Sequence, residues 1–228
     1  MKYDFDRVIP RRPTDSIKWN EYNADVLPLW VADMDFVSPE PVLQALHERV
    51  AHGIFGYPSI HQAPGGLPEV LVERMWRLYG WQITPEDLLF IPGVVTGLNL
   101  ACQALAEPGG GVLIQTPVYM PFLRLASNAG LVAQEMELSQ GSDGNYHINW
   151  QKFEGAFDKH TRIFVLCNPH NPVGRVFRRA ELERMAETCL RKKVVICSDE
   201  IHCDLLFSGN KHIPIASLDP EIAQNTIT

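Results

Sequence analysis

A continuous apolar run that ends in an acid, Val194 to Asp199, most constrains what this chain folds into. A half-buried strand alternates apolar and polar side chains, whereas a strand covered on both faces shows an uninterrupted apolar run. The run therefore predicts a strand inside a parallel sheet, with Asp199 at its carboxyl end. Ligands of open α/β sheets bind at that edge, so Asp199 is either a helix cap or a ligand group.

A second apolar run, Ile163 to Cys167, is followed by the heptapeptide Asn-Pro-His-Asn-Pro-Val-Gly at 168–174. Each proline disfavours helix in the residue before it, so Asn168 and Asn171 are predicted in extended or turn geometry. We expect His170 to lie at the surface. Two strand ends would then present amide and carboxylate side chains to one cleft.

Strands and helices alternate along most of the chain. A helix is predicted after Ser38-Pro39, where a serine cap precedes proline, and another over 67–79, both with a face toward the core. Further strands are predicted at 88–91, 112–116, 132–138 and from 225, with helices near 96–105, 122–129, 150–157 and 181–191. This alternation predicts an α/β fold with a mainly parallel sheet and crossover helices.

Composition excludes several classes of protein. With 228 residues, of which 46% are hydrophobic and 21% charged, the chain has an ordinary globular composition. A formal charge of −7 argues against nucleic acid or an anionic membrane as a partner, because both require a basic surface. We expect Arg7, Arg11 and Arg12 to form a solvated face.

The cysteines and the hydropathy pattern indicate a cytoplasmic protein. Five cysteines, with no Cys-x-x-Cys pair, favour reduced core residues over a disulfide framework or a zinc site. The first residues contain no apolar segment of a signal peptide, and no run of about 18 apolar residues occurs. We therefore expect neither secretion nor a membrane span.

Together the motifs resemble the fold-type I pyridoxal-phosphate enzymes of the class I and II aminotransferase superfamily. Asn-Pro-x-Asn-Pro-x-Gly at 168–174, followed by Ser-Asp-Glu-Ile-His at 198–202, carries this resemblance. His202, where most such enzymes have tyrosine, and the segment 29–36 (LWVADMDF) resemble the MalY/PatB branch of cystathionine β-lyase-like carbon–sulfur lyases. The resemblance implies a three-layer αβα fold with a mainly parallel mixed sheet, incomplete at its C-terminus.

The resemblance also implies the cofactor, pyridoxal 5'-phosphate, and assigns side chains to its ring. Asp199 would pair with the pyridinium nitrogen, and Asn171 would donate to the phenolic oxygen. His202 would reach the same edge, and Tyr119, which follows Thr116-Pro117, would stack on the ring. The residues alone also allow an alternative for each of these side chains. Asp199 is then a capping or salt-bridged acid, His202 a structural histidine and Tyr119 a core aromatic. Glu200 is expected to point away from the ring.

The cofactor's phosphate and the substrate have their own expected contacts. The turn Gly93-Val94-Val95 lies between a predicted strand and a predicted helix, where backbone N–H groups and the helix dipole bind anions. The resemblance implies that Tyr57 reaches the phosphate of a neighbouring subunit in a homodimer, although it is equally a turn tyrosine. It also implies that the backbone at Ala32, with Asn171, flanks the substrate carboxylate, whereas Asp33 and Asp35 act only as caps.

The domain organisation follows from the same resemblance. Residues 1–45 are expected to form an N-terminal arm and small-domain or dimer contact segment, and residues 46–228 a partial large cofactor-binding domain. In the family, the last predicted strand leads to a Ser-x-Lys segment whose lysine binds the cofactor, and then to a small domain. Neither occurs before Thr228, so we expect a fragment that is inactive alone.

The leading functional hypothesis is a carbon–sulfur β-lyase that acts on cystathionine-like amino acids and releases pyruvate, ammonia and a thiol. An aminotransferase would use the same side chains around the cofactor and is the first alternative. A non-catalytic fragment or regulatory binding protein is the second. His202 and the segment 29–36 favour the lyase.

Overall fold

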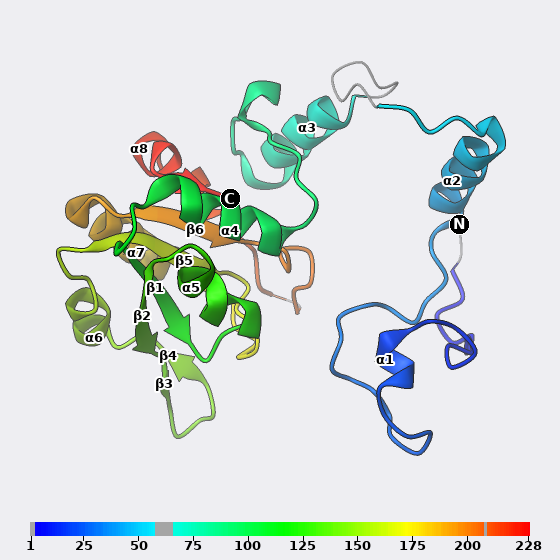
Figure 1. The fold of residues 1–228 in the computed structure, drawn as a ribbon, viewed down its shortest axis with the longest axis horizontal. Coiled ribbons are helices and arrows are strands. Elements are labelled where there is room, and N and C mark those ends of the chain that lie inside the picture. Colours follow the sequence, from blue (N-terminus) through cyan, green and yellow to red (C-terminus); the bar gives the residue numbers. More distant parts are fainter. Residues whose placement is uncertain (1–2, 58–65, 208) are drawn as a thin grey trace. The chain divides into compact units, whose positions relative to one another are not determined.

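The computed structural model describes residues 3–57, 66–207 and 209–228. The chain divides into two compact units, residues 1–58 and 59–228. The first unit contains helices α1 (Ile17–Asn20) and α2 (Glu40–His52). Every strand in the described part of the chain belongs to the second unit (Figure 1).

Helix α2 begins at Glu40 with Pro39 as its N-cap and no side-chain cap, so the predicted Ser38 cap is wrong by one residue, whereas its end before Gly53 is as predicted. Proline occupies its first turn, and Gly53 ends it in the left-handed conformation with φ 74°, its N–H donating to Val50 O. The expectation of a core-facing side is wrong for the described residues, because Val42, Leu46 and Val50 are 48%, 58% and 65% exposed. An amphipathic pattern specifies an apolar face, but not what covers it.

The second unit is built on a five-stranded parallel sheet, which confirms the predicted α/β class. Its strand order is β2-β1-β5-β6-β7, and each neighbouring pair is parallel. The strands are β1 (Gly111–Thr116), β2 (Val132–Glu137), β5 (Thr161–Cys167), β6 (Val195–Asp199) and β7 (Thr226–Ile227). A separate antiparallel hairpin pairs β3 (Ser139–Gln140) with β4 (Tyr146–His147).

Helices cover both faces of this sheet and give three layers (Figure 1). One face packs on α4 (Val94–Leu105), the 3₁₀ helix η2 (Met120–Arg124) and α5 (Leu125–Asn128). The other packs on α6 (Trp150–Gly155), α7 (Arg179–Lys192), the 3₁₀ helix η3 (Ile215–Ser217) and α8 (Pro220–Gln224). Side chains alternate between the two cores, as a strand requires: Ile196 belongs to the α7 core and Cys197 to the α4 core.

Two expected elements differ from the structure. The strand at 88–91 is absent from the described residues, and Leu89 in it is 86% exposed. A strand needs a hydrogen-bonded neighbour, and no described segment pairs with this one. The helix expected at 122–129 is instead the 3₁₀ turn η2 followed by the short α5.

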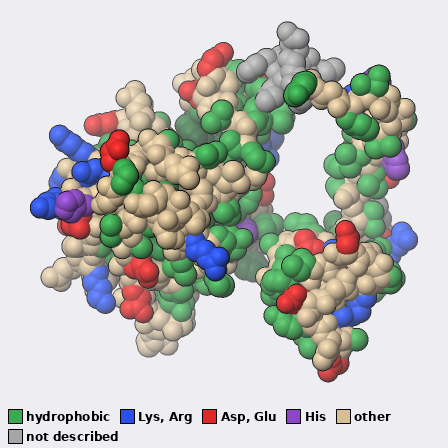
Figure 2. Space-filling view, in the orientation of Figure 1, with side chains coloured by type: hydrophobic (Ala, Val, Ile, Leu, Met, Phe, Trp, Pro, Cys, Tyr) green, Lys and Arg blue, Asp and Glu red, His purple; other side chains and the backbone are tan. Residues whose placement is uncertain are grey.

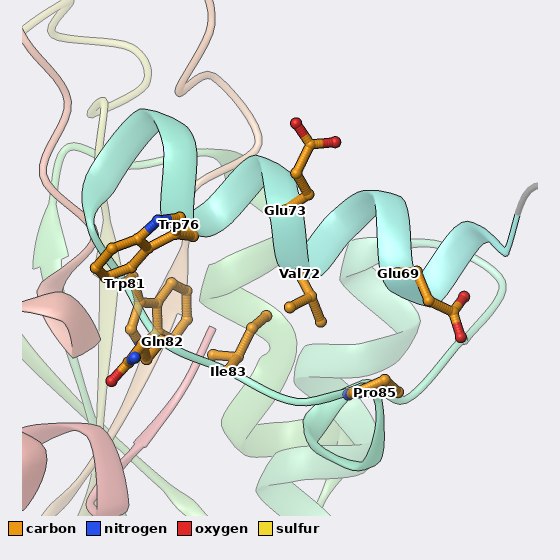
Figure 3. Close-up of a pocket in the computed structure, with 8 residues that line it drawn as sticks. All are labelled: Glu69, Val72, Glu73, Trp76, Trp81, Gln82, Ile83 and Pro85. Atoms are coloured by element: carbon orange, nitrogen blue, oxygen red, sulfur yellow. The ribbon is translucent and has the colours of Figure 1, made fainter.

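Helix α3 (Leu67–Tyr79) has the predicted bounds, with Gly80 at its end in the left-handed conformation. It leads into the 3₁₀ turn η1 (Pro85–Asp87). An open hollow lies between α3 and the chain that follows it (Figure 3). Val72 and Ile83 face each other across it, whereas the carboxylate of Glu73 points outward (Figure 3). None of the predicted site residues lines this hollow.

No helix in residues 3–57, 66–207 and 209–228 is both long and apolar enough to cross a bilayer.

We expect Phe153→Ala to destabilise the second unit by about 3–5 kcal/mol, the usual cost of removing a fully buried phenylalanine. The Phe153 side chain is fully buried, and its ring lies 5.1 Å from that of Phe157 and 5.3 Å from that of Phe164. Urea unfolding followed by circular dichroism measures the change. Phe207→Ala is the control, because Phe207 is 88% exposed. Equal effects of the two substitutions would contradict the assigned core.

Candidate active site

The carboxyl edge of the parallel sheet brings the predicted site residues together. In the pairing of β5 with β6, Cys167 is opposite Asp199, and the N–H of Asn168 donates to the Asp199 carbonyl at 2.9 Å. Asn171 follows β5 in the next loop. Tyr119 follows β1, the other neighbour of β5, and immediately precedes η2. Asp199, Asn171 and Tyr119 therefore belong to one edge.

The N-terminus of α4 reaches the same edge. The short link 106–110 joins the end of α4 to the start of β1, so the C-terminus of α4 lies at the amino edge of the sheet. A helix of this length spans about 18 Å and a six-residue strand about 20 Å, so α4 crosses the sheet from edge to edge. Gly93, Val94 and Val95 consequently lie at the carboxyl edge. Asp199 shares the strand face of Cys197, which packs in the α4 core.

The turn before α4 fits an anion. Gly93 has φ 105°, a conformation that side-chain-bearing residues rarely adopt, and nothing lies within 4 Å of where a Cβ would stand. No side chain caps the helix, and its first N–H groups have no partner inside the helix. Open backbone N–H groups at the positive end of a helix dipole are a phosphate-binding arrangement.

Asp199 is a buried acid without a cationic side-chain partner. The residue is 6% exposed, and its Oδ1 accepts a hydrogen bond from Ile201 N at 3.0 Å. No lysine or arginine of the described residues forms an ion pair with it. Burial raises the pKa of the carboxyl, and the Ile201 N–H and the nearby His202 offset this only in part. Such a carboxylate is suited to accept a cationic hydrogen-bond donor.

Hydrogen bonds hold the loop 168–178 that follows β5 at this edge. His170, expected at the surface, is 2% exposed, and its Nε2 donates to Pro117 O at 2.9 Å. The surface prediction is wrong because this bond joins the loops after β1 and β5. Burial lowers the pKa of His170, so the ring is neutral near pH 7. Phe177 N donates to the buried Asn168 Oδ1 at 3.1 Å.

Asn171 and His202 line one hollow beside this loop. Asn171 is held by its backbone N–H, which donates to Cys167 Sγ at 3.5 Å, and its side-chain amide has no partner in the described part of the chain. His202 lies in the turn after β6, with Leu205 N donating to its carbonyl at 2.9 Å. The Tyr119 ring is 42% exposed and lies 6.1 Å from the Phe122 ring, edge to face. These side chains are free to contact a ligand.

Ala32 and Tyr57 belong to the first unit, which is described by itself. Tyr57 is fully exposed. Ala32 is exposed too and lies in a segment held by two cations. Arg11 contacts Asp33 Oδ2 and Asp35 Oδ1, both at 2.8 Å, and Lys18 Nζ contacts Asp35 Oδ2 at 2.8 Å.

These contacts overturn two expectations about the first unit. Arg11 is not part of a solvated face, and Asp33 and Asp35 are ion-pair partners. Lys18 and the Trp19 Nε1 hydrogen bond lower the pKa of Asp35. Spacing along the chain did not predict this cluster, because its partners are about twenty residues apart.

A buried pair beside Asp199 was also missed from the sequence. His212 Nε2 donates to Glu200 Oε2 at 2.6 Å, and the two side chains are 1% and 9% exposed. The sequence predicted Glu200 as a structural residue that points away from the cofactor's ring, but it did not identify His212 as its partner. A lone histidine in the sequence Lys211-His212-Ile213 carries no signal of what it contacts.

The cysteines of the described residues are unpaired, and most of them lie in the core. All five cysteines are free, and four are buried. Burial raises the pKa of Cys102 to about 11 and the pKa values of Cys167 and Cys197 to about 12, so these thiols stay protonated near neutral pH. No group of three or more His, Cys, Asp or Glu in this part of the chain is arranged to hold a metal ion.

Comparisons with known proteins agree with this geometry. The model of the aminotransferase class I and II family matches residues 24–228. Cystathionine beta-lyase PatB of Bacillus subtilis is 41% identical over 231 residues, covering 99% of this chain and 59% of that protein. The chain thus spans little more than half of this relative.

Two solved structures have the same fold over nearly the whole chain. A PLP-bound putative aminotransferase from Clostridium difficile matches with a TM-score of 0.92 and 36% identity, over 99% of this chain and 58% of its own. Cystalysin from Treponema denticola, which contains a pyridoxal 5'-phosphate cofactor, matches with a TM-score of 0.91 and 33% identity, over 99% and 58%. The predicted three-layer fold of pyridoxal-phosphate enzymes is confirmed, and the match covers only part of each neighbour.

We expect Asp199→Asn to stabilise the chain near pH 7, in the absence of ligand. Since burial raises the pKa of Asp199, the folded state binds its proton more tightly than the unfolded state. The protonated Asp199 carboxyl thus stabilises the folded state at low pH. This contribution is lost as the pH rises through the pKa that Asp199 has in the folded state. The gain from the substitution should be present at pH 7 and vanish at a pH below the unfolded-state pKa of an aspartate.

Urea titrations at both pH values measure this difference. Glu187→Gln is the matched control, because Glu187 lies exposed on α7 and should show no such pH-dependent gain. Equal stability of Asp199→Asn and the unsubstituted chain at pH 7 would contradict the assigned burial cost.

Proposed function

We propose, from the premise that this chain belongs to the aminotransferase class I and II family, that it forms the cofactor-binding part of a carbon–sulfur β-lyase. The lyase would use pyridoxal phosphate to cleave cystathionine-like amino acids into pyruvate, ammonia and a thiol. The observation that carries the proposal is the buried Asp199 carboxylate, which forms no ion pair with a lysine or arginine of the described residues, at the sheet edge that also carries the loop with Asn171. The similarity to PatB over almost the whole chain favours the lyase.

The residues at the carboxyl edge fit the cofactor's ring. When bound, pyridoxal phosphate withdraws electrons from a bond at the substrate's α-carbon through its protonated pyridine ring. Asp199 would hold the proton on the ring nitrogen, because a buried carboxylate favours the charged form of a hydrogen-bond donor that faces it. The pairing would also remove the cost of leaving this acid unpaired.

The other ring contacts would come from side chains with no competing partner. Asn171 would donate its amide to the phenolic oxygen, since that amide makes no hydrogen bond in the described part of the chain. His202, which lines the same hollow, would contact the same edge of the ring. Tyr119 would stack on the face of the ring with its exposed aromatic surface.

Val94 and Val95 would bind the cofactor's phosphate through their backbone N–H groups at the start of α4, where no side chain competes. Gly93, whose own N–H donates to Ile91 O at 2.8 Å, would let the phosphate approach the backbone. Tyr57 would reach the phosphate of the partner in a homodimer. Residues 1–45 would serve as an arm and contact segment, and residues 46–228 as a partial large domain. Such a protein would act in the cytoplasm, consistent with its free, buried thiols.

The substrate is a small amino acid whose carboxylate would be recognised by the backbone at Ala32 and by Asn171. The Arg11 and Lys18 contacts to Asp33 and Asp35 would hold the backbone on the C-terminal side of Ala32 in place. An aminotransferase is the alternative, because the Clostridium difficile structure carries that description and matches the chain equally well. Both activities would use the same Asp199.

The substrate reaction can be tested in a protein that carries this chain at the full length of its relatives. We expect pyruvate from L-cystathionine without an added keto acid. Asp199→Asn should retain cofactor and lose about a hundredfold in turnover, the size of one lost charge-assisted interaction of about 3 kcal/mol. His202→Phe should have a smaller effect on turnover.

A coupled lactate dehydrogenase assay measures the pyruvate, and Glu187→Gln serves as the control. If turnover requires a keto acid and yields no pyruvate, the protein is an aminotransferase and the lyase assignment is wrong. Full activity of Asp199→Asn would reject the site itself.

We expect the 228-residue chain itself to form no covalent bond with pyridoxal phosphate. A reactive lysine must be desolvated, whereas Lys152, Lys159, Lys192, Lys193 and Lys211 are all exposed. Lys18 is buried but bonded to Asp35. Borohydride reduction followed by mass spectrometry tests this, and one stoichiometric adduct at any of these lysines would contradict it.

A further inference from the structure

Glu200, the neighbour of Asp199, lies at the centre of a buried polar cluster. Its Oε2 accepts from His212 Nε2 at 2.6 Å, and its Oε1 accepts from Ser198 Oγ at 2.8 Å and from Ile215 N at 3.2 Å. Ser198 and Glu200 flank Asp199 in the chain. The Glu200 carboxylate therefore connects the two chain neighbours of Asp199, Ser198 and Glu200 itself, to His212 and Ile215.

His212 has few other polar contacts. Its side chain is 1% exposed, and Nδ1 has no hydrogen-bond partner among the described residues. The Tyr79 ring of α3 lies 5.6 Å away, edge to face. The His212 ring is thus packed by α3 on one side and held in direction by Glu200.

This loop supplies the group that orients the Asp199 carboxylate. Ile201 N donates to Asp199 Oδ1 at 3.0 Å, and Ile201 follows Glu200 directly. A displaced Glu200 would carry the Ile201 N–H with it, because the two residues share a planar peptide bond. The order of dependence runs from His212 to Glu200, then to Ile201 and finally to Asp199.

We propose that His212 is a positioning residue that, through Glu200 and Ile201, fixes the direction of the Asp199 carboxylate toward the bound ring nitrogen. This rests on the proposed function for the identity of the ring. His212 touches neither the cofactor nor the substrate in this role. The same buried pair also stabilises the fold, so the test separates the direction of one carboxylate from general stability.

Hydrogen exchange of the Ile201 amide reports whether the hydrogen bond that directs the Asp199 carboxylate is intact, and it needs no cofactor. In His212→Leu it should speed up about tenfold or more, the effect of losing one charged hydrogen bond. His212→Gln, which keeps an N–H donor, should return within about threefold of the unsubstituted rate. The Ile196 amide, bonded to Asn225 O inside the sheet, serves as the internal reference for global opening.

Arg74→Gln is the matched control. It removes the Arg74–Asp204 ion pair, which ties the same loop to α3 without touching Glu200. Its Ile201 exchange should stay near the unsubstituted rate. Unchanged exchange in His212→Leu, equal acceleration at Ile196, or equal acceleration in Arg74→Gln would each overturn the proposal. If His212→Leu does not fold, Glu200→Gln decides in the same way, because an amide has one acceptor oxygen and its NH₂ group would face one of the donors that the two carboxylate oxygens now accept.

A second measurement keeps this inference distinct from the proposed function. Pyridoxal phosphate labelled with ¹⁵N in its ring is added to the chain, and the nitrogen shift is recorded by NMR. The unsubstituted chain should show a protonated nitrogen, and His212→Leu should move the signal toward the unprotonated position, with partial return in His212→Gln. No binding to the unsubstituted chain would reject the cofactor site only, while Ile201 exchange still decides the role of His212.

Discussion

The parallel register of β5 and β6 is the constraint on which the site depends. It sets Cys167 opposite Asp199, so the loop that carries Asn171 and the turn that carries His202 start from the same level of the sheet. The bond from Asn168 N to Asp199 O continues this pairing past the last strand residue. A shift of one residue would move Asp199 to the opposite face, away from α4.

The carboxyl edge of the sheet offers a positive and a negative group to a ligand. The start of α4 offers N–H groups and the positive end of a dipole, whereas Asp199 offers a carboxylate on the same face of the sheet. A ligand that carries an anionic group at one end and a cationic donor at the other satisfies both at once. Pyridoxal phosphate has this charge distribution, which is why the two features together support its binding better than either feature alone.

Local sequence patterns predicted most helices and strands, but they did not predict contacts between residues that are distant in the sequence. The apolar runs identified β5 and β6, and helix caps identified α3, because these signals lie within one element. The segment 88–91 has a strand's composition and no partner among the described strands, so composition alone overpredicted it. The burial of His170 and the pairing of Glu200 with His212 depend on which loops meet, and no spacing along the chain encodes that.

The adjacent acids Asp199 and Glu200 show how the fold separates stability from function. Strand alternation sends Asp199 to the α4 face and leaves Ser198 on the α7 face, where Glu200 bonds to it, to His212 and to Ile215. Glu200 is therefore satisfied by three donors, whereas Asp199 has one backbone donor and a raised pKa. A chain selected only for stability would pair both acids. Keeping one unpaired costs folding free energy, and the satisfied neighbour holds the unpaired acid in place.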